Sequence, residues 1–296
     1  MANVGFIGLG NMGMPMACRL SAAGHRVRCY DVSAAALDRA KARGLSPSSD
    51  VHSTVKDADF VISMLPSGRD VLAVFGERDD GKTLPLRQGC VVIDCSTIDV
   101  TSCAAFHRAV ALRNLLALDA PVSGGVEGAA KGTLTFMVGG SQAAFDAAVP
   151  LEAMGKKIVH AGAAGAGQIA KICNNMIAGI SMIAVSEALT LAQRLGLDPR
   201  KLFEISSASS GQCWALTSYA PVPGLVSTAP SNRAYQGGFA SELMLKDLRL
   251  AEQAAIGSGT PTPLGAAAAA LYGMHCKTAK GRLDFSSIVQ MLMERP

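Results

Sequence analysis

The first half of the chain alternates short apolar runs with longer segments whose apolar residues recur at helical spacing. The short runs predict β-strands, and the segments between them predict helices. Strands separated by helices pair in parallel through crossover connections, so the pattern predicts a doubly wound α/β domain. The expected strands are Val4–Ile7, Arg26–Tyr30, Phe60–Met64, Val91–Asp94, Leu115–Ala120, Thr133–Gly139 and Lys157–Ala161, with helices at Pro15–Ala23, Ala34–Arg43 and Gln142–Ala153.

The strand pattern stops after a glycine- and alanine-rich stretch from Gly162 to Gly167. Only helical spacing follows, so we predict two domains: a mostly parallel, Rossmann-type α/β domain over residues 1–163 and an all-α domain over residues 164–296, entered by one long helix. The expected helices are Ile169–Leu195, Pro199–Ala208, Leu243–Ile256, Pro263–Met274 and Phe285–Met293.

A glycine triplet, Gly8-x-Gly10-x-x-Gly13, follows the first strand and opens the first helix. In a dinucleotide-binding turn the first glycine permits the tight turn, the second lets the pyrophosphate approach the backbone, and the third lets helix and strand pack closely. The free N–H groups at the start of the helix favour an anion. Such a triplet also occurs in purely structural turns. We expect Gly8, Gly10, Asn11, Met12 and Gly13 to bind the cofactor.

Asp31 ends the second strand at about the spacing from the glycines at which a dinucleotide-binding fold places its ribose ligand. A carboxylate there accepts hydrogen bonds from the ribose hydroxyls and repels a 2′-phosphate. Val32 and Ser33 follow, rather than an arginine, so the sequence predicts NAD as the cofactor. The alternative is that Asp31 only shapes the turn before the helix that begins at Ala34.

Polar and glycine residues follow three further strands, where an open α/β sheet binds its ligands. Leu65-Pro66 and Ser96-Thr97 are candidates for the nicotinamide half of the cofactor, although either pair alone suits an ordinary loop. In Ser123-Gly124-Gly125 the glycines allow successive N–H groups to converge on one point, which is how a backbone nest binds an anion. This segment suits an ordinary turn equally well.

Lys171 lies near the start of the long helix of the second domain, whose neighbouring residues are mostly apolar. Asn174 and Asn175 follow at i+3 and i+4, so the three polar side chains share one face. Such groups are costly to bury without partners, and burial lowers the pKa of an amine toward the range useful for proton transfer. Lys171 is therefore either a general acid/base or a lysine that extends to solvent.

Composition excludes several other classes. The chain has 296 residues, of which 49% are hydrophobic and 17% charged, and its net charge is +4. The longest basic run is Lys156-Lys157, so no nucleic-acid surface is expected. Met176–Ala192 is interrupted by polar residues and is too short for a membrane span. No presequence pattern is evident at the N-terminus, and the eight cysteines predict reduced thiols and no metal site.

Several long segments together resemble the β-hydroxyacid dehydrogenase family, most closely its members that act on 3-hydroxyisobutyrate. The resemblance covers nearly the whole chain. The matching segments are Gly5–Gly13, Met64–Pro66, Asp94–Asp99, Asp119–Gly125, Gly132–Gly140, Gly167–Asn175, Ser209–Trp214 and Tyr235–Leu248.

The resemblance implies roles for particular residues. The lysine of Gly-Gln-Ile-Ala-Lys-Ile-Cys-Asn-Asn, here Lys171, is the catalytic residue of the family. Substrate contacts map to Ser123, Gly124, Gly125 and Asn175, while Trp214 and Phe239 line the substrate pocket. Lys246, in Leu-Met-Leu-Lys-Asp, lies near the nicotinamide. The residues alone would favour core aromatics for Trp214 and Phe239, and a surface charge for Lys246. Leu65, Pro66 and Thr97 complete the expected cofactor contacts.

The implied reaction is the NAD-dependent oxidation of 3-hydroxyisobutyrate to methylmalonate semialdehyde, a step of valine breakdown, with no metal. Two alternatives remain open. The substrate could be L-serine, or tartronate semialdehyde in the reducing direction; or the protein could be a non-catalytic module that binds the cofactor. We expect a homodimer or homotetramer, located in the cytoplasm of a bacterium or the mitochondrial matrix of a eukaryote.

Two features depart from the family pattern. Asp70 stands where relatives carry an asparagine that contacts the cofactor, and an acid near a pyrophosphate is unfavourable. The segment Glu77–Pro85 is irregular for the family, and its sequence suggests no function.

Overall fold

The computed structural model describes residues 1–76 and 84–293, so most of the irregular segment Glu77–Pro85 lies outside the described residues. The chain forms two compact units, Met1–Lys171 and Ile172–Pro296. Their boundary lies inside helix α8 (Ala166–Arg194), whereas the sequence placed the boundary at residue 163. The start of α8 belongs to the first unit, because two N–H groups there donate to the carboxylate of Asp119. They are those of Gly165, directly before the helix, and Gln168, in its first turn.

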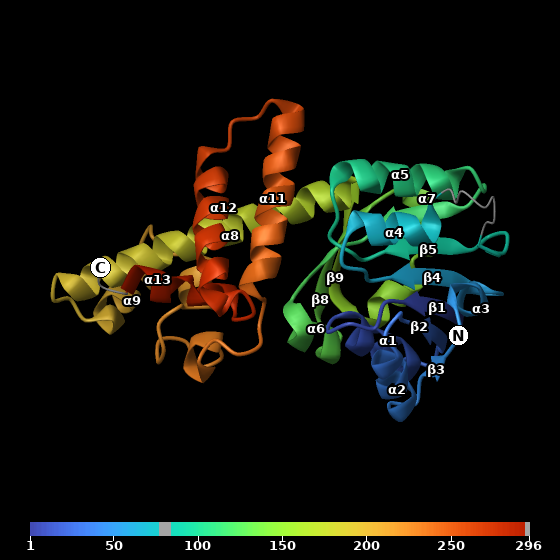
Figure 1. The fold of residues 1–296 in the computed structure, drawn as a ribbon, viewed down its shortest axis with the longest axis horizontal. Coiled ribbons are helices and arrows are strands. Elements are labelled where there is room, and N and C mark those ends of the chain that lie inside the picture. The colour runs from blue at the N-terminus through green and yellow to red at the C-terminus, as the bar shows by residue number, and fades with distance from the viewer. Residues whose placement is uncertain (77–83, 294–296) are drawn as a thin grey trace. The chain divides into compact units, whose positions relative to one another are not determined.

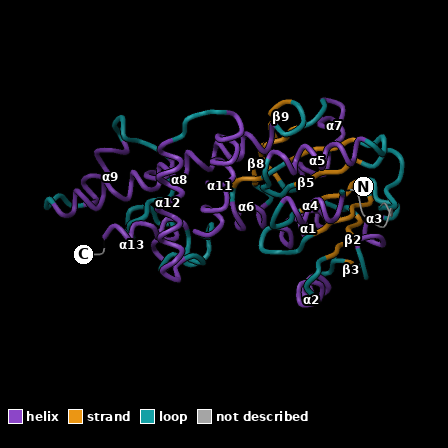
Figure 2. Tube along the Cα trace, turned by 45° about the horizontal axis from the view of Figure 1, so that its top comes forward, coloured by secondary structure: helices purple, strands orange, loops and turns teal. Residues whose placement is uncertain are grey.

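The first unit is built on one sheet, which contains nine strands among the described residues. The strand order is β3-β2-β1-β4-β5-β6-β8-β7, with β9 paired to β8 (Figures 1 and 2). The run from β3 to β6 is parallel, so the carboxyl ends of these strands meet at one edge. The strands are β1 (Asn3–Ile7), β2 (Arg26–Tyr30), β3 (Ser46–Pro47), β4 (Phe60–Ser63), β5 (Val91–Asp94), β6 (Leu116–Asp119), β7 (Val122–Ser123), β8 (Leu134–Gly139) and β9 (Gly155–Gly162).

Successive residues of the central strands pack into two separate cores. In β4, Val61 belongs to the core on one face of the sheet and Ile62 to the core on the other; in β5, Val92 and Ile93 divide in the same way. This is the alternation that a strand covered on both faces requires. Helices α4 (Gly68–Phe75) and α5 (Val100–Ala111) cover one face, and α1 (Gly13–Ala22), α2 (Ala34–Ala42) and α6 (Gly125–Lys131) cover the other (Figure 1).

The helices of the first unit are α1 (Gly13–Ala22), α2 (Ala34–Ala42), α3 (Val51–Val55), α4 (Gly68–Phe75), α5 (Val100–Ala111), α6 (Gly125–Lys131) and α7 (Gln142–Ala147). The helices predicted at Pro15–Ala23 and Ala34–Arg43 end within one residue of the ends of α1 and α2.

Three local features differ from the sequence prediction. The helix expected over Gln142–Ala153 divides into α7 and the 3₁₀ helix η1 (Val149–Ala153), because Pro150 cannot donate the hydrogen bond that an α-helix needs. The short strands β3 and β7 were not predicted. Strand β8 runs antiparallel to β6 and β7, so the sheet is mostly, but not entirely, parallel.

The second unit contains helices joined by turns and loops, and its described residues form no strand apart from one isolated bridge between Ala240 and Asp284 (Figure 2). Its core combines residues of α8 with residues of α11 (Ser241–Ser258) and α12 (Pro263–His275), including Met182, Leu248 and Tyr272, which are buried. The remaining elements are α9 (Pro199–Ser207), α10 (Trp214–Thr217), η2 (Pro230–Arg233), α11 (Ser241–Ser258), α12 (Pro263–His275), η3 (Cys276–Lys280), η4 (Phe285–Ser287) and α13 (Ile288–Met293).

Helix α8 is the one helix in residues 1–76 and 84–293 that is long and apolar enough to span a membrane. Half of its most apolar window is buried within the protein, and Met182, Ile183 and Leu189 lie in the core of the second unit. A buried core helix passes the same test of length and composition, and this is the interpretation the sequence predicted. All eight cysteines lie in the described residues and are free thiols, as predicted.

Candidate active site

The glycine turn after β1 is closed by contacts that exclude side chains. Gly8 has φ +96° and donates its N–H to the Tyr30 carbonyl at 2.9 Å, which joins the turn to the end of β2. A Cβ on Gly13 would overlap the Gly8 carbonyl oxygen. These two glycines are therefore required by the fold itself.

Gly10 differs from its two partners because the protein does not require a glycine there. A Cβ on Gly10 would meet no atom within 4 Å, and its φ is not positive. The space beside it lies at the start of α1, where Met12 provides no side-chain cap and the first turn contains no acidic residue. Asn11 is exposed at the same place. An open space at an uncapped helix N-terminus fits a pyrophosphate, so the turn fits a dinucleotide.

Asp31 has a structural task in addition to its predicted one. Its Oδ2 accepts the Leu9 N–H at 2.7 Å, and its Oδ1 accepts the Ser33 N–H at 2.8 Å. Each carboxylate oxygen has a second lone pair, and the side chain is half-buried, so capacity remains for ribose hydroxyls. Val32 beside it is 92% exposed and offers no cation to a 2′-phosphate. The two interpretations of Asp31 are thus compatible.

A buried carboxyl, Asp94, organises the next two strand ends. Its Oδ1 accepts hydrogen bonds from the hydroxyls of Ser63 at 2.7 Å and Ser96 at 2.6 Å. The Ser96 hydroxyl in turn accepts the Leu65 N–H at 2.8 Å, so the predicted cofactor segments Leu65-Pro66 and Ser96-Thr97 are joined through this carboxyl. Burial raises the pKa of Asp94 from its ordinary value of 3.8 to about 6.

Asp70 caps a helix. It is the third residue of α4, its N–H donates to the Ser67 hydroxyl at 3.4 Å, and its carboxylate accepts from that hydroxyl at 2.5 Å. An acid in the first turn stabilises a helix through the positive end of its dipole. This accounts for the departure from the family pattern at Asp70 without any contact to a cofactor.

The anion-binding segment expected at Ser123–Gly125 lies where β7 ends and α6 begins. Gly124 has φ +130° and Gly125 has φ +64°, so both occupy conformations that glycine adopts readily. Strand β7 pairs with β8, which places Ser123 opposite Thr135. The backbone therefore makes the unusual turn on which the prediction of a nest depends.

Lys171 is 7% exposed and lies in the first turns of α8. The start of this helix is fixed by Asp119, at the end of β6. Asp119 Oδ1 accepts the Gly165 N–H at 2.8 Å, and its Oδ2 accepts the Gln168 N–H at 2.9 Å. The negative charge faces the positive end of the helix dipole, which is the favourable arrangement.

The Gln168 side chain makes a second connection between α8 and the sheet. Its Oε1 accepts the Ile98 N–H at 3.1 Å, and its Nε2 donates to the Ser96 carbonyl at 2.8 Å. Ser96 also belongs to the Asp94 network. One continuous set of hydrogen bonds therefore joins the predicted nicotinamide segment to the helix that carries Lys171.

Asp119 also contacts His107, whose Nε2 lies 2.8 Å from Asp119 Oδ1. With Cys103, one turn earlier on α5, these residues place three possible metal ligands within 4.8 Å of one another. This spacing of cysteine and histidine was not predicted from the sequence. The Asp119 oxygens already accept N–H groups from α8, an arrangement typical of a hydrogen-bonded anchor.

In the second unit, Asn175 is held by a residue that was not predicted from the sequence. Its Nδ2 donates to Asp247 Oδ2 at 2.6 Å, so the carboxylate fixes the orientation of the amide. Asp247 Oδ1 lies 3.4 Å from the Nζ atom of Lys246. Asp247 therefore links two predicted site residues, Asn175 and Lys246. Asn174, by contrast, is exposed, so the predicted polar face of α8 is only partly buried.

Trp214 and Phe239 belong to one aromatic cluster of the second unit. Trp214 is 51% exposed and stacks on Tyr219 at 4.7 Å between ring centroids; Tyr219 stacks on Phe285, which meets the edge of Phe239 at 6.1 Å. Asp284 accepts hydrogen bonds from the Tyr219 hydroxyl and the Phe239 N–H, which holds the cluster together.

The residues missed from the sequence are the buried polar anchors Asp94, Asp119, Gln168 and Asp247. Asp94 and Asp119 each end an apolar strand, and this position gave a usable signal. Gln168 and Asp247 are single polar residues in helices beside residues already chosen, and nothing in their spacing distinguishes a buried anchor from a solvated side chain.

Two family models together cover most of the chain. Residues 3–162 match a model described as the NAD binding domain of 6-phosphogluconate dehydrogenase. Residues 165–292 match a model described as NAD-binding of NADP-dependent 3-hydroxyisobutyrate dehydrogenase.

Known proteins also match over nearly their whole length. The NAD-dependent L-serine dehydrogenase of Pseudomonas aeruginosa is 46% identical over 295 residues, covering 99% of this chain and 98% of that protein. The mitochondrial 3-hydroxyisobutyrate dehydrogenase of Drosophila melanogaster is 45% identical over 292 residues, covering 98% and 89%. A solved structure of Mycobacterium tuberculosis 3-hydroxyisobutyrate dehydrogenase with L-serine has a TM-score of 0.93 at 42% identity, covering 99% and 100%.

The chain belongs to the β-hydroxyacid dehydrogenase family. This dehydrogenase has an NAD-binding domain followed by a helical domain, and the predicted fold class, enzyme class and cofactor are confirmed. The roles assigned to individual residues remain predictions that rest on the geometry above.

We expect this β-hydroxyacid dehydrogenase to prefer NAD⁺ over NADP⁺ because the Asp31 carboxylate repels a 2′-phosphate. Asp31→Ala should narrow the ratio of kcat/KM values for the two cofactors by about tenfold, ~1.4 kcal/mol. Asp31→Asn should narrow the ratio too while keeping an acceptor for the turn. Asp38→Ala, an exposed acid on α2, is the matched control. Equal kcat/KM values for NAD⁺ and NADP⁺ in the wild type would contradict the assignment of NAD as the cofactor.

Asp94 should give this dehydrogenase a pH-dependent stability. Its pKa is raised in the folded state, so the folded protein binds this proton more tightly than the unfolded chain does. The free energy of unfolding of the protein should therefore fall as the pH rises from about 4 to about 6. Asp94→Asn has no carboxyl to ionise, so its free energy of unfolding relative to the wild type should rise by up to about 3 kcal/mol between about pH 4 and pH 6. Above this range the difference should stay constant. Denaturant unfolding at each pH measures the difference, with Asp146→Asn as an exposed control. A constant difference would contradict burial as the cause.

Proposed function

We propose that this enzyme oxidises the primary alcohol of 3-hydroxyisobutyrate to the aldehyde of methylmalonate semialdehyde, a step of valine breakdown. The observation that carries the proposal is the burial of Lys171 on a helix fixed to the strand end beside the cofactor segments. A buried amine in a fixed position suits proton transfer, since general acid–base catalysis depends first on geometry and then on pKa.

The residues divide the reaction between them. The N–H groups of Ser123–Gly125 and the Ser123 hydroxyl hold the substrate carboxylate. Neutral Lys171 takes the proton of the alcohol, and in reverse its ammonium form protonates the developing alkoxide. Asn175, one turn further along α8, orients the hydroxyl through an amide whose direction Asp247 fixes. When bound, NAD⁺ supplies the acceptor for the hydride that leaves the same carbon.

Support for 3-hydroxyisobutyrate over L-serine comes from the substituent beside the carboxylate, a methyl group in one and an ammonium in the other. We propose that Trp214 and Phe239 line this part of the pocket, where their rings bury a methyl group and supply no hydrogen-bond acceptor to an ammonium. L-Serine is the second candidate, because a relative named for L-serine is as similar as those named for 3-hydroxyisobutyrate. A steady-state panel of 3-hydroxyisobutyrate, L-serine, glycerate and 4-hydroxybutyrate with each cofactor decides between them: a higher kcat/KM for L-serine would overturn the first choice.

We also infer an intracellular location: the cytoplasm if the source is bacterial, and the mitochondrial matrix if it is eukaryotic. The support is the set of eight free thiols, which suits a reducing compartment. Subcellular fractionation of the source cells would contradict this if the protein were found outside them.

Lys171→Ala should lower kcat by ~10²–10⁴, the usual size of an acid–base contribution. NAD⁺ affinity should be nearly unchanged, because the predicted contacts of the dinucleotide at the glycine turn and Asp31 do not involve the amine. Lys171→Arg should also fail, since a guanidinium stays protonated. For alcohol oxidation, kcat/KM should rise with pH and level off, as the amine must be neutral. Lys201→Ala, an exposed lysine on α9, is the control. Nearly full activity in Lys171→Ala would move proton transfer to another group.

The same enzyme should be a homodimer or homotetramer whose contacts include the second unit. Helix α8 leaves Ile177 and Leu191 exposed, and Leu195, directly after its end, is exposed as well. Exposed apolar side chains along one helix favour contact with a second copy. Light scattering should give at least twice the 30.4 kDa mass of one chain. Leu191→Lys should shift the protein toward smaller species, and Gln193→Lys, at an exposed residue on the opposite face of the same helix, should not. A monomer at micromolar concentration would contradict the proposal.

A further inference from the structure

The start of α8 approaches the sheet so closely that only glycines fit between them. A Cβ on Gly139 would lie 2.5 Å from Asp119 Oδ1, and a Cβ on Gly167 would lie 2.6 Å from the Asp119 carbonyl oxygen. Gly165 has φ +88°, which turns its N–H into the Asp119 carboxylate. Gly139, Gly165 and Gly167 therefore all allow one contact, the close approach of the start of α8 to Asp119.

A carboxylate at a helix end fixes where the helix begins, but it leaves rotation about the helix axis poorly constrained. Gln168 supplies the missing constraint. Its amide bonds two different backbone groups, the Ile98 N–H and the Ser96 carbonyl, and all of these atoms are buried. Lys171 follows Gln168 by three positions, so it lies one turn further on a neighbouring face. Fixing the direction of Gln168 also fixes the direction in which Lys171 leaves the helix.

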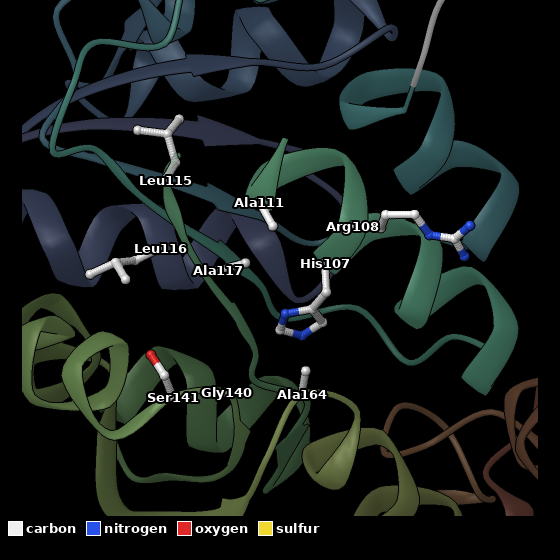
Figure 3. Close-up of a pocket in the computed structure, with 9 residues that line it drawn as sticks. All are labelled: His107, Arg108, Ala111, Leu115, Leu116, Ala117, Gly140, Ser141 and Ala164. Carbon is white, nitrogen blue, oxygen red and sulfur yellow. The ribbon is translucent and has the colours of Figure 1, made fainter. Parts of the chain in front are cut away.

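We call the contacts of Asp119, Gln168 and His107 at the start of α8 the brace. One of these residues, His107, lies at the protein surface. His107, whose Nε2 contacts Asp119, lines a shallow surface pocket together with Ala164, the residue directly before Gly165 (Figure 3). The imidazole contacts the same carboxylate oxygen, Asp119 Oδ1, that accepts the Gly165 N–H. Asp119, Gln168 and His107 together leave the first turn of the helix little freedom.

We propose that Gln168 is a positioning residue for the reaction: with Asp119, it sets Lys171 at a fixed place relative to Ser96-Thr97, the segment expected to contact the nicotinamide half of the cofactor. The inference rests on the proposed role of Lys171 as acid/base. It adds that the amine is effective only while the helix is braced, since a misplacement of about 1 Å can cost a factor of 10² in rate.

Gln168→Met keeps the length of the side chain and removes both hydrogen bonds. We expect kcat to fall about 10–100-fold, while KM for NAD⁺ changes by less than about twofold, because the predicted contacts to the pyrophosphate and ribose at the glycine turn and Asp31 do not involve Gln168. Gln142→Met is the matched control: Gln142 is an exposed glutamine of α7 bonded to Asp146, and its loss should leave kcat unchanged. Gln168→Glu keeps the acceptor for the Ile98 N–H and should show the same pattern with a smaller loss, which provides a second variant if Gln168→Met does not fold.

A double-mutant cycle with Lys171→Ala separates positioning from general structural damage. If Gln168 acts through Lys171, Gln168→Met should cost nothing further in the Lys171→Ala background. If the fold losses in kcat of the two single variants multiply in the double variant, the two residues act independently, and the proposal is overturned. The cycle also distinguishes the proposed role of Lys171 from that of Gln168. A fully active Lys171→Ala contradicts the acid/base role of the lysine. An inactive Lys171→Ala together with a fully active Gln168→Met contradicts only the positioning role of Gln168.

Amide hydrogen exchange of the cofactor-free protein gives a readout that does not depend on turnover. Gln168→Met should speed exchange in peptides that cover residues 165–172, and Gln142→Met should not. Unchanged exchange in that segment, together with a loss of kcat, would mean that Gln168 acts by another route and would overturn the proposal.

Discussion

The buried carboxylate of Asp119 at the start of α8 is the contact on which the rest of the site depends. It accepts N–H groups from Gly165 and Gln168, and its charge faces the positive end of the helix. An ionised group this deeply buried is stable only when it is well paired, and the helix supplies that pairing. Lys171 gains its position from this contact, because it lies within the first turns of the helix that Asp119 holds.

Asp94 and Asp119 are neighbours in the register of β5 and β6 but have different tasks. Asp94 bonds the hydroxyls of Ser63 and Ser96 and so shapes the segments expected beside the nicotinamide. Asp119 bonds the backbone of α8 and so places the proposed proton-transfer group. Gln168 joins the two sets through the Ser96 carbonyl. In a parallel sheet, consecutive strand ends are the natural place to organise cofactor and amine side by side.

Much of the fold was predictable because it depends on local periodicity. The strands Arg26–Tyr30 and Val91–Asp94 have the predicted limits, and the glycine turn together with Asp31 was enough to indicate the cofactor class. The contact between Asp119 and Gln168, which joins the start of α8 to the first unit, was not predictable in this way, because the two residues lie far apart in sequence. The antiparallel pairing of β8 is likewise a tertiary feature.

The candidate site was predictable where a residue type carries chemistry on its own. Lys171 stood out as a charge on an apolar helix, and the glycines of Ser123–Gly125 suggested the nest. The anchors Gln168 and Asp247 did not stand out, because a single polar residue in a helix gives the same pattern whether it is buried or solvated. Hydrogen-bond partners, rather than residue identity, distinguish these cases.

Since proton transfer by a Lys171 held in a fixed place is the central claim, a crystal structure of the wild-type enzyme with NAD⁺ and 3-hydroxyisobutyrate tests it most directly. The account predicts the Lys171 Nζ atom within hydrogen-bond reach of the substrate hydroxyl, about 2.6–3.2 Å, with the substrate carboxylate on the N–H groups of Ser123–Gly125. A substrate hydroxyl bonded to a different acid or base, with Lys171 directed away from it, would contradict the account.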